Sequence, residues 1–440
     1  MAATTLVRVG VAACGMLLAQ AVNAEVVATR LAAAPAPSPA GGPGSEARAA
    51  PTWCPKAPPL PEPTGPVIRV TTVDELFRAA REVEPGGTIL VADGHYLMPR
   101  YFEIRTDDVM LRGESGRRER VVLDGARSRH GELVGITGCA GVTVADLTIQ
   151  NVKWNGFKIN SDRFTTRVTI RNCVIHNVWQ RGVKGPAVRP EDRDRFRPSD
   201  CRVRYCLFTN DRAKRFGDDP ADRPENFGGN YVGGMDIMYP RRWTISDNVF
   251  VGIQGRTREA RGAVFLWHEA EDCVVERNII IDCDSGICLG NSHRPDDVPV
   301  HCTRCVVRNN FLARCPEQGV LADYTRDCRI VHNTVHDPGS RLRRLIRLVH
   351  HNGGLVVAGN LLSGPPMRVE TDSPMTIEHN FVEDVVNWFV DPRAGDLHLK
   401  PGVLPDAARV PRRKAIAADI DGQPRPVSTA VGADEPREAR

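Results

Sequence analysis

A short pattern of alternating apolar and polar residues recurs through the middle of the chain. It reads apolar, x, apolar, x, x, Asn and returns at intervals of roughly twenty to thirty residues. The copies end at Asn248, Asn278, Asn310, Asn333, Asn360 and Asn380. Apolar side chains at every second position favour strands over helices. We therefore predict an all-β solenoid of about nine or ten coils, in which stacked coils share one core.

The recurring Asn is predicted to have a structural role. One Asn per coil fits a ladder of side chains that hydrogen-bond along the solenoid axis, at a turn position that tolerates the left-handed backbone conformation. Cysteines keep the same register, as at Cys273, Cys305 and Cys328. We expect them to face inward as small apolar residues, and the sequence leaves open whether any of them form disulfides.

The two ends of the chain differ from the repeat. Residues 1–24 are predicted to be a signal peptide, and a lipoprotein anchored at Cys14 is the alternative. We therefore expect a secreted or periplasmic protein, which could also be attached to the cell surface. Residues 25–66 are rich in Pro and Ala and are predicted to be a disordered linker. The predicted domain spans 67–402 and begins with a capped helix after Thr72, and 403–440 are predicted to be a tail.

Composition excludes some partners. The 440 residues carry a net charge of only +4, and no block of like charge resembles a nucleic-acid-binding stripe. The apolar stretch near the N-terminus is too short for a stable membrane span. We expect a monomer.

The start of the predicted domain and the segment that follows its end resemble a known superfamily, over roughly residues 66–435. Asp74-Glu75-Leu76 with Pro85-Gly86-Gly87 at the start, and Asp419-Ile420-Asp421-Gly422 at the end, frame the Asn-ended coils. Together they resemble the pectate-lyase-like right-handed parallel β-helix proteins. The resemblance implies a single-stranded right-handed parallel β-helix whose N-terminal end is capped by the short helix. That superfamily holds lyases, hydrolases, epimerases and members without established activity, so the resemblance implies fold more strongly than chemistry.

A second strand, usually opened by Gly, precedes each Asn-ended strand. Period-two alternation places Lys158, Lys184 and Asp236 outward on three consecutive coils. Two of only seven lysines thus fall in one column beside an aspartate. The alternative interpretation of this column is a solvated charge ladder with no function.

Two charge-dense inserted segments, Arg189–Asp200 and Asp211–Asn230, interrupt the repeat between Gly182 and Asn248 and are expected to wall this face. They and the adjoining strands supply the other candidate residues, namely Arg212, Arg215, Asp218, Asp219, Asp222, Arg242, Trp267, His268 and Glu269. Because neighbouring strand residues point to opposite faces, at most one of His268 and Glu269 can serve the site.

A walled sheet face with basic residues suits an acidic, uronate-containing polysaccharide. Cleavage by β-elimination needs a base, for which we predict Lys184 beside Lys158, and an Arg on the carboxylate, for which we predict Arg242 or Arg212. Asp236 and Arg215, with Trp267, His268 and Glu269, are predicted to bind substrate. Calcium held by Asp218, Asp219, Asp222 and Asp236 is the alternative way to neutralise the carboxylate. A glycoside hydrolase, an epimerase and a noncatalytic glycan-binding or cell-surface module remain open alternatives.

Overall fold

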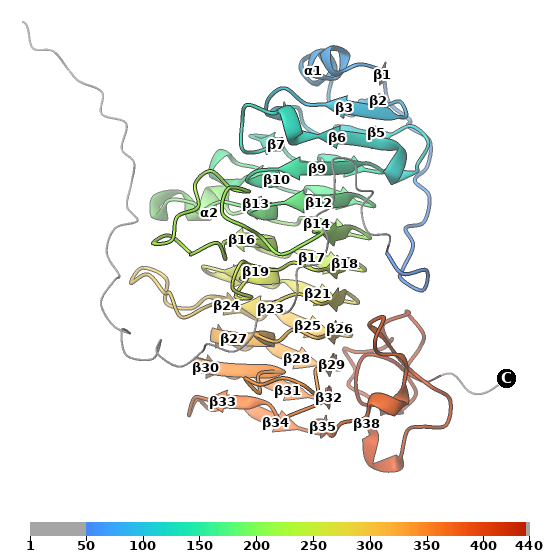
Figure 1. Ribbon diagram of the computed structural model, residues 1–440, viewed down its shortest axis with the longest axis vertical. Coiled ribbons are helices and arrows are strands. Elements are labelled where there is room, and N and C mark those ends of the chain that lie inside the picture. Colours follow the sequence, from blue (N-terminus) through green and yellow to red (C-terminus); the bar gives the residue numbers. More distant parts are fainter. Residues whose placement is uncertain (1–49, 437–440) are drawn as a thin grey trace, which may run out of the picture. The chain divides into compact units, whose positions relative to one another are not determined.

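The computed structural model describes residues 50–436, so the predicted signal peptide and residues 25–49 of the predicted linker lie outside the described residues. Nearly all of the strands are parallel and fall into three long sheets, which we call A, B and C. The structure confirms the predicted right-handed parallel β-helix (Figure 1).

Each coil contributes one strand to each sheet. Sheet A contains β1 (Val67–Val70), β2 (Thr88–Val91), β5 (Met110–Gly113), β8 (Thr143–Ala145), β11 (Thr169–Arg171), β14 (Arg202–Arg204), β17 (Thr244–Ser246), β21 (Val274–Glu276), β25 (Val306–Arg308), β28 (Arg329–Val331), β31 (Val356–Ala358) and β34 (Thr376–Glu378). Sheet B contains β3 (Gly94–Leu97), β6 (Val121–Asp124), β9 (Thr148–Val152), β12 (Val174–Val178), β15 (Leu207–Thr209), β18 (Val249–Val251), β22 (Ile279–Ile281), β26 (Phe311–Ala313), β29 (Thr334–His336), β32 (Leu361–Ser363) and β35 (Phe381–Val382).

Sheet C carries the candidate residues of the column. It contains β4 (Phe102–Ile104), β7 (Val134–Thr137), β10 (Asn155–Asn160), β13 (Arg181–Gly185), β16 (Gly233–Met238), β19 (Gly262–Trp267), β23 (Ser285–Leu289), β27 (Gln318–Arg326), β30 (Ile346–Gly353) and β33 (Arg368–Glu370), with β20 (Ala270–Glu271) and β24 (Cys302–Thr303) beside the end of β27. Within residues 50–436, ten coils have a strand in all three sheets, which agrees with the nine or ten predicted, and β1, β34 and β35 belong to incomplete coils at the two ends.

Inward columns of apolar side chains form the core between the three sheets. In sheet C, Phe157, Val183 and Met235 are in register on β10, β13 and β16 and are fully buried. Parallel stacking places each inward residue directly on its counterpart in the previous coil. The period-two pattern of one strand therefore predicts the side of the sheet to which every side chain of that column points.

The Asn ladder is present, but the left-handed residue is not the Asn itself. Asn310 donates from Nδ2 to Oδ1 of Asn333 at 2.9 Å, and the same bond links Asn278 to Asn310 at 3.0 Å. The positive φ falls one residue earlier, at positions such as Arg277 and Asn309. The preceding residue makes the turn, and the Asn side chain then bonds to the backbone of the previous coil and to the Asn side chain of the next coil.

The glycines that open the sheet C strands lie at the inner corner between sheets B and C. A Cβ on Gly182 would lie 2.7 Å from the Phe208 ring, and a Cβ on Gly234 would lie 2.7 Å from Phe250. The ring centroids of these two phenylalanines are 4.5 Å apart in the core. Glycine is needed at this corner because the aromatic core comes against the backbone.

Helix α1 (Val73–Glu82) lies at the N-terminal end of the coils in Figure 1. It begins with the predicted capping box, in which the side chain of Thr72 accepts from the Glu75 amide at 3.2 Å and Glu75 accepts from the Thr72 amide at 3.2 Å. Its buried residues Leu76 and Phe77 join the solenoid core. The second helix, α2 (Arg193–Phe196), lies in the first inserted segment.

The segments on either side of the coils pack along the solenoid. Arg112 and Arg171 donate to the carbonyls of Pro61 and Pro58, so residues 50–66 of the predicted linker are held against sheet A. The C-terminal segment forms the antiparallel pairs β36 (Phe389–Asp391) with β37 (Asp396–Leu399) and β38 (Arg409–Pro411) with β39 (Ser428–Ala430). It covers apolar residues on the outer face of sheet B, so it belongs to the folded unit and is not a free tail.

Short 3₁₀ turns lie at Arg118–Arg120, Gly125–Arg127, Ser161–Arg163, Pro190–Asp192, Val386–Trp388 and Asp406–Ala408. The twelve cysteines among residues 50–436 are free and buried, and all except Cys54 and Cys288 join the core between the sheets, as expected for inward-facing small residues. Within the same range, no helix combines the length and the apolar character that a bilayer crossing needs.

Candidate functional site

The predicted column exists on the outward face of sheet C. Lys158 is in register with Lys184, and Lys184 with Asp236. The same column begins at Glu103 and Gly135 and continues through Phe265, Cys288, Leu321 and Arg347. The three predicted residues therefore belong to a longer outward column, whose two ends differ in chemistry from its middle.

The middle of the column is a closed ionic cluster around Asp236. One carboxylate oxygen of Asp236 lies 2.8 Å from Nε of Arg181 and 3.0 Å from Nζ of Lys184, and the other accepts from Nε1 of Trp267 at 2.9 Å. Burial by itself would raise the pKa of Asp236, but the charges of Lys184 and Arg181 outweigh it and lower the pKa to about 2. Both Asp236 oxygens are thus occupied by protein donors. We call Arg181, Lys184, Asp236 and Trp267 the Asp236 cluster.

Sequence reasoning missed Arg181. Strict alternation back from Lys184 places residue 181 inward. The Cβ direction of Gly182 points toward the Phe208 ring, so the alternation breaks at the corner glycine and Arg181 points outward. Its guanidinium then lies 3.9 Å from the centre of the Tyr231 ring. Gly182, the second residue of β13, was the available signal, because a corner residue does not follow the pleat.

The structure does not bring the predicted calcium ligands together. Asp218 forms a bidentate pair with Arg212, at 2.6 and 2.7 Å. Asp219 and Asp222 lie 3.2 and 3.3 Å from the buried ammonium of Lys214. These pairs lie within the second inserted segment, which Gln180 links to the solenoid by donating from Nε2 to Asp219 at 2.8 Å.

Among the described residues, the only convergence of three potential metal ligands is His398 with Asp421 and Asp434, in the C-terminal segment. The four predicted aspartates therefore do not fit a calcium site, because protein cations already neutralise them.

Four further predicted residues lie outside the two pockets described below. Arg242 is paired with Asp200 at 2.7 Å. Arg215 is exposed, and its amide donates to Asp218 at 2.7 Å. His268 and Glu269 follow the end of β19 with positive φ, so neither is part of the strand.

The imidazole of His268 is buried beside His301, with ring centroids 5.5 Å apart. Burial, followed by the neighbouring His301, lowers the pKa of His268 to about 3. A neutral, enclosed ring of this kind is a core group, and it does not line either pocket.

At the N-terminal end of the column, the face opens into a pocket of about 380 Å³ around Lys158. We call it the Lys158 pocket, and it is lined by Tyr101, Glu103, Arg105, His130, Glu132, Thr137, Lys158, Asn160, Asp162 and Arg163. Nζ of Lys158 lies 2.8 Å from Glu132. Of the two predicted lysines, Lys158 is the one that lines an open pocket, with 27% of its side chain exposed against 11% for Lys184.

Tyr101 occupies a gap in the outward column of this pocket. Its hydroxyl lies over Gly135 and accepts from Nδ2 of Asn160 at 3.0 Å. Burial raises the pKa of Tyr101 well above its usual range, so the phenol keeps its proton. Tyr101 stacks on the exposed ring of His130, with centroids 5.1 Å apart. The sequence pattern predicted neither residue, because the predicted column begins at Lys158, one coil after Gly135.

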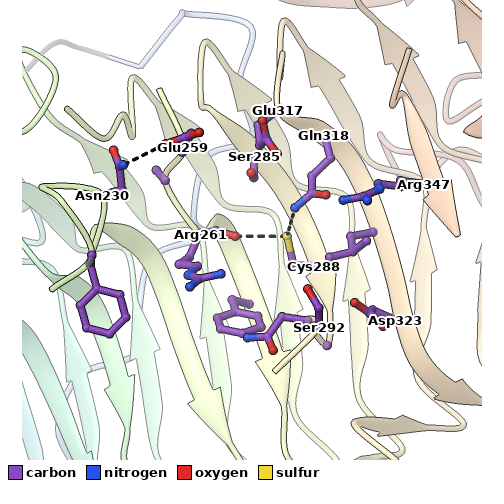
Figure 2. A pocket seen from close by; sticks show the side chains of 16 residues that line it. Asn230, Glu259, Arg261, Ser285, Cys288, Ser292, Glu317, Gln318, Asp323 and Arg347 are labelled. Carbon is purple, nitrogen blue, oxygen red and sulfur yellow. Dashed lines mark hydrogen bonds between the residues drawn. The ribbon is translucent and has the colours of Figure 1, made fainter. Parts of the chain in front are cut away.

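At the other end of the column, a pocket of about 350 Å³ lies over β19, β23 and β27 (Figure 2). We call it the Arg261 pocket, and it is lined by Phe227, Asn230, Glu259, Ala260, Arg261, Phe265, Ser285, Cys288, Gly290, Asn291, Ser292, Glu317, Gln318, Leu321, Asp323 and Arg347. Its floor is the outward apolar group Phe265, Cys288 and Leu321. Burial raises the pKa of the Cys288 thiol to about 12, so this cysteine is part of the floor and not a nucleophile.

Comparison with known proteins supports the architecture. A family model described as the right-handed beta helix region matches residues 132–362. Among solved structures, pectate lyase Pel9A aligns with a TM-score of 0.52 and 12% identity, covering 82% of this chain and 90% of its own. An alginate lyase from Paenibacillus sp. str. FPU-7 gives a TM-score of 0.37 and 11% identity, covering 72% of this chain and 99% of its own. No curated protein sequence matches. The likeness to Pel9A shows a shared fold.

Proposed function

Because this chain belongs to the right-handed beta helix family, we propose that it binds an acidic, uronate-containing polysaccharide on sheet C and cleaves it by β-elimination in the Lys158 pocket. One observation carries the proposal. The pocket joins an amine, a protonated phenol and two guanidinium groups on the outward face of sheet C. β-Elimination needs a base, an acid for the leaving oxygen and a cation for the carboxylate, and this pocket holds one candidate for each.

The cations of the pocket are assigned to the substrate carboxylate. Arg105 and Arg163 are exposed at its edge, and their planar guanidinium groups suit bidentate binding of a carboxylate. Binding the carboxylate stabilises the negative charge that develops when the neighbouring carbon 5 loses its proton.

Lys158 is assigned as the base in place of Lys184. The amine takes the proton from carbon 5, the electron pair forms a double bond between carbons 4 and 5, and the bond from carbon 4 to the glycosidic oxygen breaks. Tyr101 gives its phenolic proton to that oxygen. The products are an unsaturated uronate end and a new chain end, and water returns the proton from Lys158 to Tyr101.

His130 is assigned as a hydrogen-bond donor. Nδ1 of His130 accepts from the Glu132 amide at 3.1 Å, which places the proton of the neutral ring on Nε2. A ring in this tautomer offers an N–H to the pocket and no lone pair, so it can hold a substrate oxygen but cannot act as the base. No step of the reaction runs through calcium, because the predicted ligands are paired with protein cations.

The test is release of unsaturated uronate, followed by its ultraviolet absorbance, from pectate, alginate and chondroitin with and without a chelator. Lys158→Met and Tyr101→Phe should each lower the rate by about 10²-fold or more. Lys153→Met is the matched control, since Lys153 lies in the same coil, outside the pocket, and within residues 50–436 its ammonium bonds only to the Ser128 carbonyl, at 3.5 Å.

Full activity in Lys158→Met would refute the assigned base. Reducing ends without unsaturation would identify a hydrolase, and binding without any product would identify a noncatalytic glycan-binding module.

A further inference from the structure

The Arg261 pocket contains buried polar atoms that have no partner. Oγ of Ser285 and Oε1 of Gln318 are buried, and neither makes a hydrogen bond within residues 50–436. The two residues are in register on the neighbouring strands β23 and β27 and line the same pocket. Buried polar atoms are nearly always satisfied, so two adjacent unsatisfied ones in a pocket indicate a place for a polar ligand.

The guanidinium group of Arg261 lines the same pocket. Arg261 immediately precedes β19, is exposed, and its guanidinium has no hydrogen bond or ion pair in the part of the chain described. Its backbone carbonyl accepts from Sγ of Cys288 at 3.2 Å, which ties the residue to the pocket floor (Figure 2). Across the pocket, Nε of Arg347 is occupied by Glu370 at 2.6 Å. Arg261 is therefore the cation available to a ligand.

The floor of the pocket is apolar. Phe265 stacks on Trp267 with ring centroids 4.8 Å apart and an interplanar angle of 23°. The carbon–hydrogen face of a sugar ring suits such a surface, while its hydroxyls suit the serine and glutamine oxygens. A carboxylate on the ring suits the free guanidinium.

We propose that the Arg261 pocket is a second binding site, distinct from the Lys158 pocket, for a carboxylated sugar unit. The ring packs on Phe265, its carboxylate pairs with Arg261, and its hydroxyls bond to Ser285 and Gln318. Phe265 is three coils from Lys158 in the same outward column, which is about 14 Å at the strand spacing. The Asp236 cluster closes the face between the two pockets. The choice of a uronate rests on the proposed function, whereas the location of the site does not.

Binding is measured by calorimetry on the full chain carrying Lys158→Met, so that no probe is cleaved. The probes are short oligosaccharides of galacturonate, guluronate, mannuronate and glucuronate, with neutral glucose oligosaccharides for comparison. Arg261→Gln and Ser285→Ala are the test variants. Ser285→Ala removes a hydroxyl that has no partner, so it should leave the melting temperature unchanged. Arg329→Gln is the control, because it makes the same charge change on the exposed face of sheet A.

We expect at least one uronate probe to bind, about tenfold more weakly to Arg261→Gln and severalfold more weakly to Ser285→Ala, with Arg329→Gln unchanged. Equal binding to both test variants and the parent would overturn the site, as would a neutral oligosaccharide that binds as tightly as the uronates. If binding does not depend on Arg261 but the native chain still cleaves a polymer by β-elimination, only the second site is refuted. If binding depends on Arg261 but the native chain releases no unsaturated product from any polymer, only the proposed reaction is refuted.

Discussion

The hydroxyl of Tyr101 occupies the space that a side chain at position 135 would fill. A Cβ on Gly135 would lie 1.9 Å from that oxygen. Gly135 is the position of the outward column between Glu103 and Lys158, so the missing side chain brings the phenol onto the sheet beside the lysine. The glycine is thus a positioning residue for the proposed acid.

Gly135→Ala should displace the phenol and lower the elimination rate by about 10²-fold, because small misplacements of reacting groups are costly. Tyr101 is half-buried and can swing outward, so the fold should survive. The check is kcat together with the melting temperature. Gly353→Ala is the matched control, as a Cβ on that sheet C glycine would meet no atom within 4 Å. An unchanged kcat in Gly135→Ala would remove Tyr101 from the reaction.

The pH–rate profile should rise toward alkaline pH. A lysine base acts as the neutral amine, so the rate grows as pH increases. Burial raises the pKa of Tyr101, so the acid keeps its proton at pH values where an ordinary tyrosine would begin to lose it. The profile should therefore show no fall near pH 10, the usual range of tyrosine. A rate that declines above neutral pH would exclude a lysine base.

Removing the carboxylate of Asp236 should be strongly destabilising. Asp236→Ala leaves the buried Arg181 and Lys184 without their anion, at a cost of about 3–5 kcal/mol. The exposed pair of Arg242 with Asp200 provides the comparison, and Asp200→Ala should cost about 0–1 kcal/mol. Urea unfolding of both variants measures the difference. Similar losses in the two variants would contradict the closed cluster.

The same carboxylate should make stability depend on pH in the acid range. The pKa of Asp236 is about 2 in the folded protein against an ordinary 3.8. A lowered pKa means that the unfolded chain binds the proton first, so this contribution is complete above about pH 4 and is lost as pH falls toward 2. The stability difference between the native chain and Asp236→Asn should therefore shrink over that range. A difference that stays constant down to pH 2 would show that Asp236 titrates normally.

The Asn ladder should weaken toward its C-terminal end. Asn310→Ala leaves the Asn278 amide and the Val275 carbonyl without partners, at about 1–3 kcal/mol for each buried group. Asn380 ends the ladder and is only partly buried, so water can replace its bonds and Asn380→Ala should cost less. Thermal unfolding of the two variants measures the gradient. Equal losses would mean that the ladder acts through its turns and not through its buried bonds.

Much of the site's register was predictable from local pattern. Lys158, Lys184 and Asp236 share a column because each strand alternates and each coil stacks on the one before it. Arg181 was not predictable in the same way, because the corner glycine beside Phe208 interrupts the alternation. The pairing of Lys214 with Asp219 and Asp222 was equally hidden, since it lies within an inserted segment that has no period.

The repeat and its alternation determined the parallel coils, the inward core, the Asn ladder and the outward column, because those features depend only on a residue and its neighbour one coil away. The tertiary structure alone decided which part of the column is open. Arg181, Lys184 and Trp267 enclose Asp236, while Lys158 at one end and Phe265 at the other line pockets. That choice depends on contacts made by the inserted segments and the corner glycines. Such contacts follow no period that could be read along the chain.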